Sequence, residues 1–410
     1  MKKHLCILLL ASNFVISLTI HAQRVTQLSI DQDSAKYTTT AFRAITFELD
    51  TAFNDKTFLH TAEKTYTILP DEHVPITHGK IKSKLIVFDA PQHSFSIETT
   101  DPEQIKIAYL IYTPDIKTEI KLKNQPHDSC SQPPMIMQEV WRAGLPDPDY
   151  ERIPNTVHNQ IIHHSATDNE LTDYVNLIRS IYIYHTEVNG WSDIGYNYLI
   201  SPDGLLFAGR DPGDNLAQDD VLGAHFCAAN TGTMGICMLG TFIKQTPTPE
   251  ALSTLNHLVS WKAIWSNLDP QGTYSHPLNP NLPTIAGHQD GCATSCPGDS
   301  LVKLLPQIRA LSLETLYNCG VFPGLRTINN SSLLKISPNP TNSATINYSS
   351  SLQLSSAALF DLFGNQLVVW QSLSPEKSLH LPATIKEGLY MIRFITITGN
   401  VITQKILVID

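Results

Sequence analysis

The chain has 410 residues, of which 42% are hydrophobic and only 16% are charged, so it is not a mainly disordered protein. Its 28 Lys and Arg are outnumbered by 38 Asp and Glu, giving a formal net charge of -10. This acidic balance argues against nucleic acid as a partner. The length allows about two to four domains.

Residues 1–23 have the pattern of a secretory signal peptide. A basic start is followed by an apolar stretch at residues 5–20 and a small-residue cleavage site at residues 21–23. The alternative is a membrane anchor, but the apolar stretch is short and is interrupted by polar residues. No later segment is apolar enough to span a bilayer. We therefore expect a secreted or cell-surface protein with no transmembrane segment in the mature chain.

Residues 24–130 predict a β-rich accessory domain. Short runs of alternating polar and apolar residues, such as SKLIVFD and IKIAYLIYT, are separated by Pro, Asp and Asn. Such runs are typical of a small antiparallel sheet or sandwich. We find no polar cluster with catalytic spacing here, so an accessory or binding role is favoured.

Residues 131–318 predict an α/β domain with a central, mostly mixed β-sheet flanked by helices. Strand-like runs such as NQIIHHS and GTMGICMLGTF alternate with stretches of helical apolar spacing at residues 172–189, 249–267 and 300–312. Thr248 is expected to cap the second helix, with Pro249 at its first position.

Residues 319–334 are expected to be a linker, and residues 335–410 return to all-β patterning. The dipeptides Gly364-Asn365 and Gly399-Asn400 are typical of hairpin turns between strands. We therefore expect a small C-terminal β-sandwich.

Two histidines and one cysteine of the α/β region are candidate zinc ligands: His163, His288 and Cys296. Imidazole and thiolate are good zinc ligands, and a catalytic zinc takes three protein ligands and keeps one open position. Successive side chains of a strand point to opposite faces, so His163 and His164 cannot both face one pocket without a bulge. On spacing alone a structural interpretation, with buried histidines and a disulfide-bonded cysteine, is equally open.

The motifs of this region occur in a familiar order. The segments HHSAT, WSDIGYNYLI, GAH with a later MGICMLGTF, and GHQD with TSCPG resemble the zinc-dependent N-acetylmuramoyl-L-alanine amidases of the amidase-2 type. Peptidoglycan recognition proteins belong to the same family. The resemblance covers residues 131–315, including the upstream segment VWRA. It implies a zinc hydrolase that cleaves the amide bond between N-acetylmuramic acid and L-alanine of peptidoglycan or muropeptides.

The resemblance also implies roles for individual residues. His163, His288 and Cys296 match the family's zinc ligands, whereas His164 does not. Tyr196 and Thr294 match positions that stabilise the developing oxyanion. Thr294 stands where the phage member of the family has Lys, so a positive charge is not available from this position.

Three further residues are expected to contact substrate: Trp191, His225 and Asn230. A structural role for His225 is equally open. Asp193 and Asp290 are candidates for protonating the leaving amine, although the capping of turns is the favoured role for both.

The remaining cysteines after the signal peptide suggest disulfides, because an oxidising compartment permits them. Cys237 lies in an apolar run and is most simply a buried hydrophobic residue. With Cys296 assigned to the metal, the expected pairs are Cys227–Cys292 and Cys130–Cys319.

Residues 335–410 resemble the C-terminal sorting domain of the type IX secretion system. The resemblance rests on the opening ISPNP, the segments LFDLFGNQLV and EGLYMIRFITITGN, and the terminal run VITQKILVID. It implies that the type IX secretion machinery recognises the tail as an address. The alternative is a carbohydrate-binding or adhesive β-sandwich.

Two functions of other classes compete with the amidase: a non-catalytic module that recognises peptidoglycan, and a structural or adhesive surface protein. Family members that only recognise peptidoglycan commonly lack the cysteine ligand. The presence of Cys296 therefore favours the enzyme.

Overall fold

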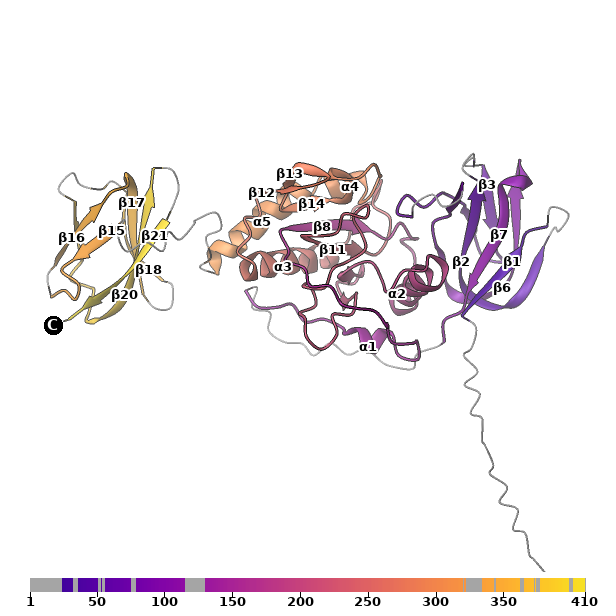
Figure 1. Cartoon of the computed structure of the whole chain (residues 1–410), viewed down its shortest axis with the longest axis horizontal. Helices are drawn as coiled ribbons and strands as arrows, with labels where there is room; N and C mark the ends of the chain where they lie inside the picture. Colours follow the sequence, from indigo (N-terminus) through magenta and orange to yellow (C-terminus); the bar gives the residue numbers. More distant parts are fainter. Residues whose placement is uncertain are drawn as a thin grey trace, which may run out of the picture.

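The computed structural model describes residues 24–31, 36–50, 53, 56–74, 79–114, 130–319, 321, 334–342, 344–361, 365–371, 373, 377–397 and 401–409. These residues fold into an N-terminal part (24–114), an α/β part (130–319) and a C-terminal part (334–409), which follow one another in Figure 1. The expected signal peptide and the turn residues Gly364, Gly399 and Asn400 lie outside the described residues. Within the described residues no helix is both long and apolar enough to cross a membrane.

The N-terminal part is built from antiparallel strands. They are β1 (Val25–Ser29), β2 (Tyr37–Asp50), β3 (Thr57–His60), β4 (Thr65–Thr67), β5 (Lys80–Lys82), β6 (Ile86–Thr99) and β7 (Ile105–Ile111), with a short 3-10 helix η1 (Pro102–Gln104) before β7. The sheet order is β1-β7-β2-β6-β3-β4, and β5 pairs with β2. The long strands β2 and β6 bury aromatic residues such as Phe42, Phe47 and Phe95, which form the core of this part.

The α/β part has the mixed central sheet that the sequence predicts. Its strands are β8 (Asn159–His164), β9 (Tyr198–Ile200), β10 (Leu206–Ala208), β11 (Thr233–Met238) and β14 (Ile285–Gly287), in the order β10-β9-β11-β8-β14. β10 pairs with β9 in antiparallel fashion, whereas the other neighbours are parallel. A separate hairpin joins β12 (Thr273–His276) to β13 (Asn279–Pro283).

Helices cover both faces of this sheet. They are α1 (Gln138–Trp141), α2 (Tyr174–Ile183) with its π-helical extension η2 (Tyr184–Val188), α3 (Pro249–Trp265), the 3-10 turn η3 (His288–Asp290), α4 (Asp299–Val302) and α5 (Leu305–Asn318). α2 packs on the face that carries Leu199 and Cys237, and α3 and α5 pack on the face that carries Ile162 and Ile236. Alternate strand residues therefore serve opposite cores.

Helix boundaries follow local chemistry. The predicted cap of α3 is confirmed, because the Thr248 hydroxyl accepts a hydrogen bond from the N–H of Ala251 and Pro249 begins the helix. The helix predicted at residues 300–312 is wrong as a single element. Pro306 lacks an N–H and its ring clashes with the preceding turn, so the chain forms α4 and restarts as α5.

The two expected disulfides are present: Cys130–Cys319 and Cys227–Cys292. The described cysteines outside them are Cys237 and Cys296, and both are buried.

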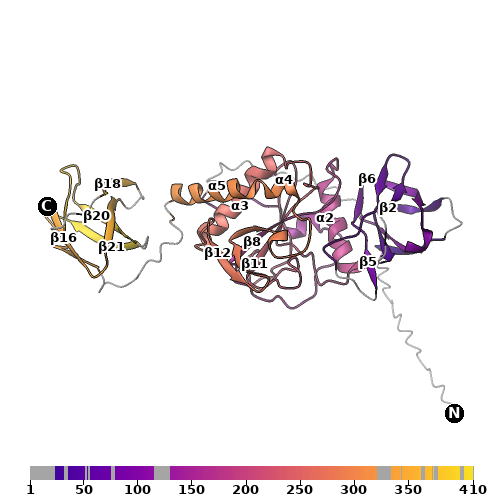
Figure 2. The ribbon, with the colours of Figure 1, turned by 90° about the horizontal axis from the view of Figure 1, so that it is seen from above.

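The N-terminal part packs directly on α2. Ala44, Leu85, Val87 and Ile111 belong to one hydrophobic cluster with residues of α2, including Ile181. Polar contacts surround this cluster, because the Asp89 carboxylate accepts hydrogen bonds from the N–H groups of Thr172 and Asp173. Both views of the ribbon show α2 against β2 and β6 (Figures 1 and 2). The first two parts therefore share a continuous core.

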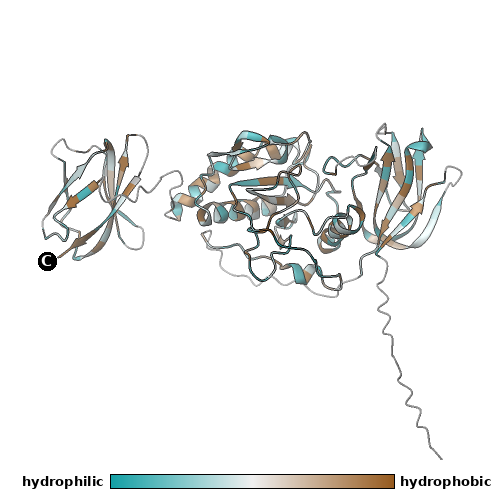
Figure 3. Ribbon diagram, in the orientation of Figure 1, coloured by the Kyte–Doolittle hydropathy of each residue, from teal (hydrophilic) through white to brown (hydrophobic). Residues whose placement is uncertain are grey.

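The C-terminal part has its own core. Its strands are β15 (Leu334–Ser337), β16 (Thr345–Ser350), β17 (Leu354–Phe360), β18 (Gln366–Trp370), β19 (Ser378–His380), β20 (Gly388–Thr396) and β21 (Val401–Val408). They form the sheets β15-β16-β19 and β18-β17-β20-β21, which pack around Ile346, Leu359, Ile392 and Phe394. Figure 3 shows hydrophobic and hydrophilic residues mixed along these strands, as half-buried sheets require.

Candidate metal centre

The ends of two neighbouring parallel strands bring the predicted histidines together. Ile162 of β8 is paired with Gly287 of β14, so the next residues lie side by side: His163, which is still in β8, and His288, which begins η3. Their imidazole centroids are 4.4 Å apart. Cys296 follows on the loop between η3 and α4, and its Sγ lies 3.7 Å from Nδ1 of His163.

A third histidine joins this group. One ligand atom from each of four residues lies within 4.8 Å of the others: His73, His163, His288 and Cys296. The three ligands that the sequence predicts are therefore brought together. His73 comes from the N-terminal part, between β4 and β5, and is not among the ligands predicted from the sequence.

The donor atoms of the group suit a metal ion. Nδ1 of His288 and Nε2 of His73 are buried and have no hydrogen-bond partner among the described residues. Buried polar atoms without a partner are uncommon, and each such atom requires an explanation. Three imidazole nitrogens and one thiolate form a donor set that zinc accepts well. A second cluster of Cys227, His288 and Cys292 is not equivalent, since its cysteines are joined in a disulfide.

Protonation favours His163 and His288 as ligands. Burial, followed by the nearby imidazoles, lowers the pKa of His163 well below its ordinary value and that of His288 to about 2. Both rings are therefore neutral near pH 7, the form that binds a metal. Burial would also lower the pKa of His73, but its hydrogen bond with Asp71 and the nearby Cys296 side chain raise it to about 10.

A chain of hydrogen bonds supports His163 from behind. Its Nε2 lies 3.0 Å from Nδ1 of His225, whose Nε2 lies 3.3 Å from the Thr233 hydroxyl. The Thr233 hydroxyl donates to the carbonyl oxygen of Asn230 at 2.7 Å. This chain places the proton of His163 on Nε2 and leaves Nδ1 free for a metal. His225 is buried behind His163. This position agrees with the structural role considered for His225, and not with contact to substrate.

His164 is separated from the ligands although it is next to one of them. Its Nδ1 accepts a hydrogen bond from the N–H of Phe242 at 3.4 Å, and its Nε2 is buried without a partner among the described residues. Its backbone N–H lies 3.3 Å from Sγ of Cys296. Thus its backbone contacts the Cys296 sulfur, while its imidazole does not join the cluster.

The residues expected to stabilise an oxyanion lie beside the centre. The Tyr196 ring centroid is 5.2 Å from that of His163, and burial raises the pKa of its hydroxyl well above the ordinary value. The hydroxyl therefore stays protonated and able to donate. The Thr294 hydroxyl accepts from the N–H of Cys296 at 3.1 Å and donates to a carboxylate oxygen of Glu72 at 2.8 Å.

Trp191 and Asn230, which are expected to contact substrate, organise neighbouring loops. The Trp191 ring lies 4.5 Å from that of His185. The side-chain oxygen of Asn230 accepts hydrogen bonds from the N–H groups of His225 and Phe226, both at 2.8 Å.

The two aspartates considered as proton donors cap turns, the role favoured from the sequence. Asp193 accepts from the N–H groups of Ile194 and Asp211, at 2.6 and 2.8 Å. Asp290 accepts from the N–H of Gly287 at 2.8 Å.

The absence of a polar cluster in the N-terminal region was a wrong expectation. Asp71, Glu72 and His73 are consecutive, and all three make contacts at the candidate metal centre. Asp71 Oδ1 lies 3.0 Å from Nδ1 of His73, while Glu72 accepts from Thr294 and from Ser295. Partial burial would raise the pKa of Glu72, but the hydrogen bonds from Ser295 and Thr294 lower it to about 2. The only sequence signal is a carboxylate close to a histidine in PDEHVP, which is too common to identify a ligand.

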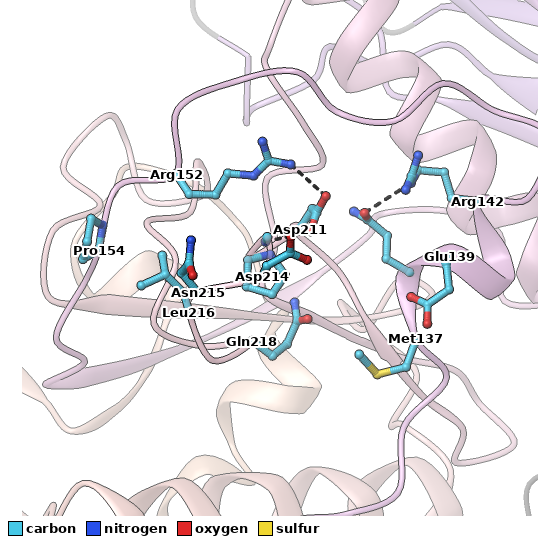
Figure 4. A pocket seen from close by; sticks show the side chains of 13 residues that line it. Met137, Glu139, Arg142, Arg152, Pro154, Asp211, Asp214, Asn215, Leu216 and Gln218 are labelled. Atoms are coloured by element: carbon cyan, nitrogen blue, oxygen red, sulfur yellow. Dashed lines mark hydrogen bonds and ion pairs between the residues drawn. The ribbon is translucent and has the colours of Figure 1, made fainter.

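A separate cavity of about 840 Å³ lies between α1 and residues 211–218 (Figure 4). The close view shows Arg152 paired with Asp211, at 2.8 Å, on its wall. The described residues that line it include none of the predicted site residues.

The α/β part is similar in sequence to known proteins. The family described as N-acetylmuramoyl-L-alanine amidase matches residues 154–299. Peptidoglycan recognition protein 1 of Bos taurus is 30% identical over 176 residues, which are 42% of this chain and 83% of that protein. A solved structure of Drosophila PGRP-LB is 26% identical, with a TM-score of 0.34, and the match covers 42% of this chain and 91% of that one.

Other relatives are matched over a smaller share of their own length. Peptidoglycan-recognition protein LE of Drosophila melanogaster is 31% identical over 128 residues, which are 31% of this chain and 35% of that protein. The N-acetylmuramoyl-L-alanine amidase of Homo sapiens is 30% identical over 128 residues, again 31% of this chain but 19% of that protein. The chain thus spans about a third and a fifth of these two relatives. Through its α/β part, the chain belongs to the family of amidase-2 enzymes and peptidoglycan recognition proteins.

Proposed function

We propose that the protein is an exported, zinc-dependent N-acetylmuramoyl-L-alanine amidase. The observation that carries the proposal is the convergence of His163, His288 and Cys296 at one buried point. Relatives named as amidases, and a family match that spans these three residues, support the same activity. Peptidoglycan or its soluble muropeptides would be the substrate.

In this reaction water is added across the amide bond between muramic acid and L-alanine. The products are the lactyl carboxylate of the sugar and a stem peptide with a free amino group. Zinc held by His163, His288 and Cys296 would supply a Lewis acid for the carbonyl group and for water.

The chain's own residues would hold the charge that develops. The buried Tyr196 hydroxyl stays protonated and would donate a hydrogen bond to the carbonyl oxygen as it becomes negative. Thr294 would donate a second bond once its hydroxyl is released from Glu72. His225 would keep His163 in the tautomer that binds metal.

The proposal includes export, with residues 1–23 as the signal peptide and residues 335–410 as the type IX sorting domain. The β-strands of the C-terminal part and the two disulfides are consistent with it. Deleting residues 335–410 is expected to leave the protein in the periplasm, as measured by cell fractionation. Normal release of the truncated protein would refute the sorting role.

The test of activity uses residues 24–410 and purified muropeptides, with products identified by mass spectrometry. The His73→Ala variant is assayed in parallel, because His73 occupies a ligand position. Release of intact stem peptide, lost with a chelator and restored by zinc, is expected. Cys296→Ala should abolish it, and Cys237→Ala should not. Binding without cleavage by both the intact chain and His73→Ala would identify a recognition module instead.

A further inference from the structure

We infer that the N-terminal part holds the metal centre closed, with His73 as a fourth ligand and Glu72 bound to the loop that carries Cys296. The inference rests on the proposed function, since the closed centre is that of the hydrolase. Its structural basis is a single segment, residues 70–74.

The N-terminal sheet fixes this segment in place. Pro70 forms a β-bridge with Ser83, and the N–H of Asp71 donates to the carbonyl of Lys82 at 2.8 Å. On the other side, the Tyr184 hydroxyl of the α/β part donates to Asp71 Oδ2 at 2.8 Å. The segment is thus attached to both parts of the chain, with Asp71 at the junction.

His73 has the arrangement of a metal ligand. Its Nδ1 lies 3.0 Å from Asp71 Oδ1, and its side chain is only 14% exposed. Its ring stacks on that of His288 with centroids 5.3 Å apart and planes at 13°. Its Nε2 is buried and has no hydrogen-bond partner among the described residues, and His73 belongs to the ligand cluster. A carboxylate that orients the far nitrogen of a histidine is the usual support of metal-binding imidazoles.

A fourth protein ligand changes the type of the site. Catalytic zinc keeps three protein ligands and one open position, whereas structural zinc is closed by four. With His73 in place, the centre has the ligand number of the closed type. The position needed by water or by the substrate carbonyl is then taken by the chain itself.

Glu72 occupies Thr294, the second hydrogen-bond donor that the reaction would need. One of its carboxylate oxygens accepts from the Thr294 hydroxyl at 2.8 Å, and the other accepts from the Ser295 hydroxyl at 2.6 Å. Lys84 stands 3.5 Å from the same carboxylate. The Thr294 hydroxyl, which would donate to the carbonyl oxygen of the substrate, therefore already donates to Glu72.

A small cavity lies beside the centre, next to His73 and Tyr196. The cavity bounded by Asp71, His73, Ser165, His185 and Tyr196 has a volume of about 30 Å³. That is room for a water molecule, whereas ligand pockets have volumes of roughly 300–1,000 Å³. A muropeptide does not fit this cavity while Asp71 and His73 stay in place.

Cobalt(II) in place of zinc gives a test that does not depend on catalysis. The full mature chain is loaded with cobalt and titrated with azide, an anion that binds an open metal position and changes the visible spectrum. Azide is expected to leave the wild-type spectrum unchanged and to shift that of His73→Ala. His93→Ala, which removes an exposed histidine of the same sheet, should behave as wild type.

Activity gives a second readout. Removing His73 should raise zinc-dependent muropeptide cleavage by at least about tenfold, because the rate scales with the fraction of open centres. Glu72→Ala loosens the same segment without altering a ligand, and should give a smaller rise together with partial azide binding. This second variant keeps the test valid if His73→Ala does not fold, as judged by near-UV circular dichroism.

The outcomes separate the two proposals. Equal azide binding by wild type and His73→Ala would overturn the closed centre, as would a His73→Ala protein that is folded but has lost both metal and activity. Azide entry confined to His73→Ala and Glu72→Ala, with no cleavage by any of the proteins, would support the closed centre and refute the hydrolase.

Discussion

Gly235 is the position where one added methyl group tests how the metal ligands are supported. It is buried in β11, and a Cβ atom built there lies 2.6 Å from Cγ and Cδ2 of His225 and 2.9 Å from its Nδ1. Distances below 3.0 Å are not tolerated, so the His225 ring must shift. That ring holds Nε2 of His163 at 3.0 Å. Gly235→Ala therefore disturbs this contact while both histidines remain.

The expected effect has two components. Loss of an outer hydrogen bond to a ligand typically lowers metal affinity about 10- to 100-fold, or roughly 1.4–2.8 kcal/mol. Overpacking of the buried strand should lower the free energy of unfolding by about 1–3 kcal/mol. Zinc affinity is measured by competition with a chromophoric chelator, and stability by urea denaturation of the metal-free protein.

His225→Ala supplies the matched control. In that background the new methyl group has no ring to displace, so Gly235→Ala should add little to the loss of zinc affinity. The two changes should thus be strongly non-additive. A folded Gly235→Ala protein with the zinc affinity of wild type would refute the role of His225 as the support of His163.

The remaining predictions concern the ligand choice, the rim and the metal. His163→Ala should abolish zinc binding and His164→Ala should largely keep it, because only the first ring is in the ligand cluster; equal losses, by elemental analysis, would contradict this. Replacing Cys227 and Cys292 by Ser should lower the free energy of unfolding by up to about 4 kcal/mol, given a separation of 65 residues, and an unchanged urea midpoint would argue against it. Zinc at 100 times its dissociation constant should stabilise the N-terminal and α/β parts, which share a core, by about 2.7 kcal/mol. The unfolding transition of the C-terminal part should stay unchanged. Calorimetry that shows both transitions shifted equally would exclude a local site.

The sequence predicts those features whose determinants are close together in the chain. Thr248 and Pro249 determine the start of α3 by themselves, and His288 and Cys296 are eight residues apart on one connected loop. The mixed sheet follows from strand-like and helical patterns that alternate.

Features that depend on packing between distant segments were not predictable. His73 is 90 residues before His163. Only the docking of the N-terminal part on α2 brings the His73 ring to the ligand cluster. The alternation within a strand indicates that His163 and His164 diverge, but not which face carries the metal. The role of His225 was not predictable either, because its ring position depends on the space left by Gly223 and Gly235.

The disulfide between Cys130 and Cys319 has a mechanical consequence. It joins the two ends of the α/β part, with Cα atoms 5.7 Å apart and a sequence separation of 189. Tension applied to the two ends of the α/β part would pass through the sulfur atoms and bypass the intervening chain. Fully extended, that chain would add roughly 600–700 Å, all of which stays outside the load path. Reduction of this one bond would let the same tension act on the strands and loops that carry His163, His288 and Cys296.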